Sequence, residues 1–85
     1  MTIQQIVGDN IRRIRERRNL SQEGLAYDAG MSKAYVGEVE RAEKAITIGR
    51  LEKLAKVLGV STEVLLIPEY YRTLSEPSRH GGFTR

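Results

Sequence analysis

The stretch of sequence that decides the fold runs from Gln22 to Arg41 and reads QEGLAYDAGMSKAYVGEVER. Its first half has apolar residues spaced as on one face of a helix: Leu25, Ala26 and Ala29. Gly30 follows them, and glycine often ends a helix because it adopts positive φ without a Cβ penalty. This half therefore predicts a short helix that stops at Gly30.

The second half predicts another short helix, from about Lys33 to Arg41. Ser32 is a good N-cap, and Met31 before it supplies an apolar plug for the turn. Val36 and Val39 recur at helical spacing. Two helices joined by a glycine-containing turn form a helix-turn-helix, whose second helix can enter the major groove of DNA. The alternative is an ordinary helical hairpin, which the narrow spacing disfavours.

The flanking segments predict three further helices. The helix over residues 1–18 has a core stripe made of Ile3, Val7, Ile11 and Ile14. A helix capped by Thr47 and ended by Gly59 has a stripe made of Ile48, Leu51, Leu54, Ala55 and Leu58. A fifth helix starts at Ser61 or Thr62 and ends before Pro68.

We therefore expect an all-α fold, in which five helices form a compact domain over residues 1–67. The extension over residues 68–85 begins with apolar residues and ends in SEPSRHGGFTR. That last piece is polar and contains proline and paired glycines, so we expect it to be mobile.

Composition excludes several classes of function. The chain has 85 residues, enough for one domain, and no long apolar run, so we expect no membrane span and no export signal. With no cysteine, one histidine and no clustered metal ligands, we expect no enzyme, metal or cofactor, and a cytoplasmic location. The 14 Lys+Arg exceed the 11 Asp+Glu only slightly, so the position of the charges matters more than their sum.

The predicted second helix of the motif has two distinct faces. Val36, Val39 and Glu40 point toward the core, whereas the outward face consists of Ala34, Gly37, Glu38 and Arg41, with Lys33 and Tyr35 on its flanks. Small residues on the outward face would let the helix backbone lie deep in a groove. A carboxylate on the core side requires a partner, because an unpaired buried charge is costly.

Three segments carry a family resemblance: IRRIRERRNLSQEGLA, GMSKAYVGEVER and ITIGRLEKLAKVLGVS. Together they resemble the lambda/434-repressor-like regulators of the xenobiotic-response-element type, over about Val7 to Ile67. The resemblance implies that Arg15 pairs with Glu40. It implies base-edge contacts from Ser32, Lys33, Ala34, Gly37 and Glu38, and phosphate contacts from Gln22, Lys44 and Arg41. It also implies that Gln22 supports the recognition helix, the second helix of the motif. Tyr35 either donates its hydroxyl to a phosphate or packs on the preceding helix.

A narrower resemblance is to the small controller proteins of restriction–modification systems. Lys33-Ala34-Tyr35-Val36 and Thr47-Ile48 are similar to segments of that group. Gly37 and Ala45 depart from it, since serine and asparagine are frequent there.

The sequence thus predicts a DNA-binding transcription regulator, such as a repressor, that acts as a homodimer on double-stranded DNA with a palindromic site. Lys33 is expected to read guanine, and Glu38 either accepts a hydrogen bond from cytosine or is a solvated charge. The expected dimer surface consists of Leu65, Leu66, Ile67, Tyr70, Tyr71 and Leu74. An alternative function is an antitoxin or adaptor whose tail, from Tyr70 to Arg85, engages a partner protein.

Overall fold

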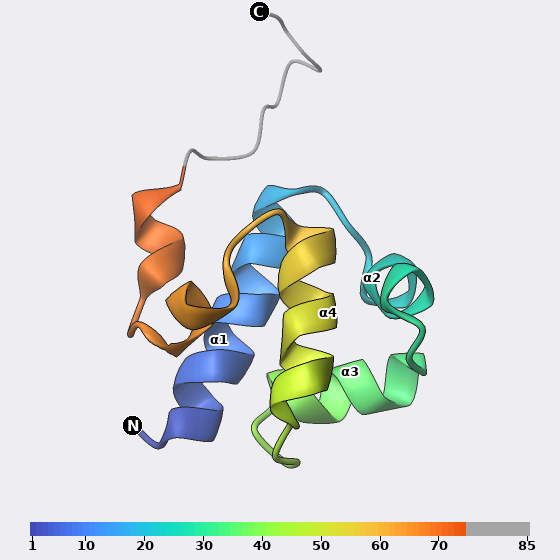
Figure 1. Ribbon diagram of the computed structural model, residues 1–85, viewed down its shortest axis with the longest axis horizontal. Coiled ribbons are helices and arrows are strands. Elements are labelled where there is room, and N and C mark those ends of the chain that lie inside the picture. The colour runs from blue at the N-terminus through green and yellow to red at the C-terminus, as the bar shows by residue number, and fades with distance from the viewer. Residues whose placement is uncertain (75–85) are drawn as a thin grey trace, which may run out of the picture.

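The computed structural model describes residues 1–74, which form four α-helices and two short 3-10 helices (Figure 1). The α-helices are α1 (Ile3–Arg17), α2 (Gln22–Ala29), α3 (Lys33–Glu40) and α4 (Ile48–Leu58), and the 3-10 helices are η1 (Thr62–Leu66) and η2 (Tyr70–Thr73). The predicted all-α class is confirmed. The predicted fifth α-helix is wrong in type, because this segment forms η1. The segment SEPSRHGGFTR lies outside the described residues.

Helix ends are set by local side-chain caps. Ser21, Ser32 and Thr47 each accept a hydrogen bond from a backbone N–H in the first turn of the helix that follows. Thr2 does the same for α1, and the Gln5 side chain accepts the Thr2 N–H at 2.7 Å to complete a capping box. The helix therefore starts at Ile3, two residues after the predicted start at Met1.

The core lies where α1 and α4 meet, with α2 and α3 on one side and the 3-10 helices on the other (Figure 1). The fully buried large apolar side chains come from five elements and are Ile11, Ile14, Leu25, Val36, Val39, Leu54, Leu58 and Leu65. Two predicted core residues are instead exposed: Ile3 by 53% and Ile48 by 81%. Both stand at the first position of their helix, and helical spacing identifies a face without showing whether a neighbour covers its end.

Asn10 connects the segment from η1 to η2 to α1 through hydrogen bonds. This fully buried amide donates hydrogen bonds to the carbonyl oxygens of Leu65, at 3.1 Å, and Ile67, at 2.8 Å, and it accepts one from the Tyr71 N–H at 3.3 Å. A buried amide in such a position satisfies backbone groups that a 3-10 segment leaves unpaired. The packed unit consequently extends to Leu74, beyond the boundary at residue 67 that the sequence suggested.

This packing also corrects the expected dimer surface. Leu65 and Tyr71 are buried within their own chain, so neither is available to a partner. Tyr70 and Leu74 are partly buried against the same core. Leu66 and Ile67 remain exposed.

Gly8 sets the distance between α1 and the end of α3. A Cβ at this position would lie 2.5 Å from the carbonyl oxygen of Val39 and 2.7 Å from that of Glu40. Both neighbours are backbone atoms, so no side chain can rotate away. The two helix backbones therefore approach this closely only because residue 8 is glycine.

We predict that Gly8→Ala lowers the free energy of unfolding by about 1–3 kcal/mol, the usual cost of overpacking a core. Urea denaturation followed by circular dichroism measures this difference. Gly49→Ala is the matched control, since a Cβ on this α4 glycine meets open space and should leave stability equal or higher. Equal midpoints for Gly8→Ala and the wild type would contradict the assigned contact.

Candidate nucleic-acid interface

The turn between α2 and α3 has the geometry that the sequence predicts. Gly30 adopts φ 73° and ψ 32°, in the left-handed region. The Met31 N–H donates to the Ala26 carbonyl at 2.8 Å, which closes the end of α2. Ser32 then accepts the Tyr35 N–H at 3.0 Å and starts α3. This chain of local hydrogen bonds fixes the angle at which α3 leaves the turn.

A buried polar network holds α3 on its core-facing side. Arg15 of α1 forms a bidentate ion pair with Glu40, with Nε to Oε2 at 2.7 Å and Nη2 to Oε1 at 3.1 Å. The Gln22 side-chain amide donates to Glu40 Oε1 at 3.0 Å, and Arg15 also donates to the Leu20 carbonyl at 3.0 Å. The side chain of Glu40 is 2% exposed and that of Arg15 is 12% exposed. One carboxylate thus ties α1, α2 and α3 together.

The structure places Gln22 in this network, with its amide committed to Glu40. The resemblance implied both a phosphate contact and support for the recognition helix. The hydrogen bond to Glu40 accounts for the support. The phosphate contact stays a prediction.

The outward face of α3 differs from the expected one at Gly37. Ser32, Lys33 and Ala34 are exposed and Glu38 is partly exposed, but Gly37 is buried. A Cβ on Gly37 would lie 3.1 Å from Arg41 Nη1 and 3.5 Å from Gln22 Oε1. The expectation that Gly37 offers bare backbone to a groove is therefore wrong for the free chain. Its lack of a side chain instead leaves room for two long side chains that fold over it.

The loop after α3 holds two cations beside carboxylates. Arg41 and Glu43 form a bidentate pair, with Nε to Oε2 at 3.0 Å and Nη2 to Oε1 at 3.1 Å. Lys44 Nζ lies 3.4 Å from Glu38 Oε1. The hydrogen bond to Glu43 raises the pKa of Arg41, and the same bond lowers the pKa of Glu43. Both pairs are solvent-exposed.

Two cations lie close to the ring of Tyr35. The Arg50 guanidinium is 5.0 Å from the centre of its ring, and Lys44 Nζ is 5.9 Å from it. Both distances are within the range of cation–π attraction. Sequence reasoning missed Arg50, although a signal was present: Arg50 is in the first turn of a helix, where the dipole disfavours a cation. The cation–π contact with the Tyr35 ring gives this arginine a favourable partner.

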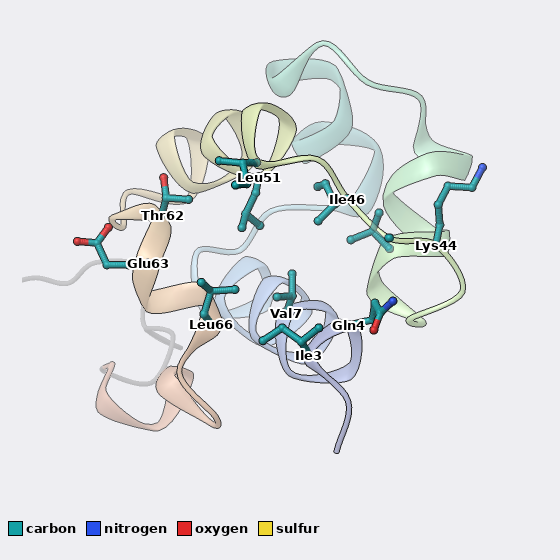
Figure 2. A pocket seen from close by; sticks show the side chains of 12 residues that line it. Ile3, Gln4, Val7, Lys44, Ile46, Leu51, Thr62, Glu63 and Leu66 are labelled. Carbon is teal, nitrogen blue, oxygen red and sulfur yellow. The ribbon is translucent and has the colours of Figure 1, made fainter.

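An apolar groove of about 410 Å³ opens beside this loop. In Figure 2 the side chains of Ile3, Val7, Leu51 and Leu66 converge on it from α1, α4 and η1, and Lys44 lies at one end. The exposed side chains of Ile3, Ile48 and Leu66 all line it. Among residues 1–74, no helix is long and apolar enough to span a membrane.

We predict that Glu40→Gln lowers the free energy of unfolding by about 3–5 kcal/mol, because it leaves the Arg15 guanidinium nearly buried without a carboxylate. Glu43→Gln is the matched control, since it removes the carboxylate of an exposed bidentate pair and should not change the unfolding midpoint measurably. Chemical denaturation of both variants tests this contrast. Similar midpoints for the two variants would show that the buried network does not hold α3.

Comparison with known proteins places the chain among regulators. It is 44% identical over 66 residues to the control protein C.SmaI of Serratia marcescens, covering 78% of this chain and 79% of that protein. The restriction–modification controller protein C.AhdI of Aeromonas hydrophila superposes with a TM-score of 0.71 at 34% identity, covering 73% of this chain and 94% of that chain. SinR, a master regulator of biofilm formation solved in complex with DNA, superposes with a TM-score of 0.68 at 36% identity, covering 71% and 97%. Residues 11–65 match the helix-turn-helix family HTH_3, and the chain therefore belongs to that family.

Proposed function

We propose that the protein is a sequence-specific transcription regulator that binds a palindromic DNA operator as a homodimer, in the manner of a restriction–modification controller protein. The observation that carries this proposal is the exposed N-terminal half of α3, with Ser32, Lys33 and Ala34 open to solvent, on a helix fixed from behind by buried Glu40. The similarity to C.SmaI and C.AhdI supports the controller assignment.

In this proposal α3 lies in the major groove, and base edges meet its N-terminal half. Lys33 donates to guanine O6 and N7, and Glu38 accepts from cytosine N4. Ser32 and Ala34 are small enough to allow close approach. Gly37 contributes by leaving room for the side chains of Gln22 and Arg41, which approach the phosphates together with Tyr35 and Lys44.

A single module reads too few bases for useful specificity. Each good contact discriminates by about 1–3 kcal/mol, so two modules on two half-sites are required. The apolar groove supplies the surface through which two copies join, because Ile3, Ile48 and Leu66 leave a contiguous apolar patch exposed in the monomer. Ile67, also exposed, extends the apolar surface of this segment.

Selection of bound duplexes from a random-sequence library tests operator recognition. We expect a palindrome whose half-sites lie about one helical turn apart. Lys33→Ala should relax the preference at one position of each half-site, at a cost of about 1–3 kcal/mol for the preferred base. Uniform weakening on all sequences would instead identify Lys33 as a phosphate contact.

The dimer surface is tested by sedimentation at tens of micromolar protein. We expect the wild type to be a dimer and Ile48→Glu to be a monomer, because the change puts a charge on the apolar rim. It should not harm folding, since Ile48 is 81% exposed and an acid is favourable in the first turn of a helix. Tyr27→Ala is the control, because Tyr27 is 83% exposed and does not line the groove. A dimeric Ile48→Glu variant would exclude the groove as the interface.

A further inference from the structure

The two loop cations proposed to contact phosphate, Arg41 and Lys44, are already paired with carboxylates in the free chain. Arg41 has one edge of its guanidinium, Nε and Nη2, paired with Glu43 at 3.0 and 3.1 Å. Lys44 lies 3.4 Å from Glu38. Exposed pairs of this kind contribute little to stability, so stability alone does not explain why both loop cations are paired.

The backbone places Glu43 beside Arg41. Ala42 adopts φ 61°, a left-handed conformation that is unusual for a residue with a side chain. The Glu43 N–H donates to the Glu38 carbonyl at 2.8 Å and the Ala42 N–H to the Val39 carbonyl at 3.0 Å, so a closed turn follows α3. This turn reverses the chain and keeps the Glu43 carboxylate within reach of Arg41. The pair is therefore a product of the fold at this helix end.

The Arg41 guanidinium also lies close to the start of α2. Its Nη1 lies over Gly37, 3.1 Å from where a Cβ would be, and Gln22 lies over the same glycine. The guanidinium thus lies next to the residues proposed to approach DNA, with its charge compensated by Glu43.

We propose that Glu43 and Glu38 act as internal counter-ions for Arg41 and Lys44 and thereby limit sequence-independent binding to DNA. The proposal rests on the proposed function and names the residues that set its specificity. A cation that binds a phosphate normally releases condensed salt ions, and this release drives non-specific affinity. A cation that stays paired with its carboxylate neutralises no phosphate and releases no salt ions, so random DNA is bound more weakly and with a smaller dependence on salt.

The Glu38–Lys44 pair couples this limit on sequence-independent binding to the recognition of a base. On random DNA, freeing Lys44 leaves the Glu38 carboxylate uncompensated near phosphates. On the operator, cytosine N4 donates to Glu38 and replaces Lys44 as its partner. Lys44 is then free to contact a phosphate only when the base opposite Glu38 is correct.

The test measures binding of the full chain to a random-sequence duplex across a series of salt concentrations. Glu43→Gln should bind this duplex more tightly at low salt and should steepen the slope of log K against log salt by about 1 per protomer. Its affinity should therefore fall roughly threefold further than that of the wild type between about 50 and 200 mM salt, for each released cation. The ratio of operator affinity to random-duplex affinity should fall. Glu43→Gln keeps the shape of the side chain and changes only its charge.

Two controls separate this effect from the general loss of a negative charge. Glu52→Gln removes an exposed carboxylate of α4 for which the structure of residues 1–74 gives no ion pair, and it should leave the slope unchanged. In an Arg41→Ala background, Glu43→Gln should no longer steepen the slope, because no cation is released.

A wild type that binds DNA, combined with equal slopes for Glu43→Gln and Glu52→Gln, would overturn the counter-ion role. Persistence of the Glu43→Gln effect without Arg41 would overturn it as well. A wild type that binds neither the random duplex nor any selected duplex would overturn the proposed function itself.

Discussion

The structure depends on one buried carboxylate. Glu40 stands at the end of α3 with its side chain 2% exposed, and a charge in that position persists only if it is fully paired. Arg15 supplies two hydrogen bonds from α1 and Gln22 supplies one from the start of α2. Because these partners come from separate elements, satisfying Glu40 fixes how α3 lies against both of its neighbours. The side of α3 away from this network is left to face outward.

Two glycines adapt the surroundings of α3 in opposite ways. Gly8 permits the backbone of α1 to touch the backbone at the end of α3, so it acts within the core. Gly37 permits the side chains of Gln22 and Arg41 to fold across α3, so it acts at the surface. A Cβ on Gly8 would meet rigid carbonyl oxygens, whereas one on Gly37 would meet the movable ends of long side chains. A side chain at position 8 would therefore lower stability, whereas one at position 37 would displace the Arg41 guanidinium.

Local signals in the sequence predicted local structure well. The caps at Ser21 and Ser32 and the left-handed Gly30 depend on neighbours within a few residues, so the sequence alone predicts the helix-turn-helix. Long-range features could not be predicted from such local signals. Nothing in the sequence near Asn10 indicates hydrogen bonds to carbonyls 55 and 57 residues away. Periodicity placed Ile48 on an apolar face but could not show that no part of residues 1–74 covers it. The burial of Gly37 depends on side chains from α2 and from the end of α3.

The central claim is that the exposed face of α3 meets DNA while the network behind it stays intact. Backbone amide chemical shifts, followed by NMR as a selected operator duplex is added, test this most directly. The account predicts large shifts for residues 32–38 and 41–44 and small ones for the buried amides of Ile11, Ile14 and Leu54. Shifts that leave residues 32–38 unchanged, and gather instead on α4 and η1, would contradict it.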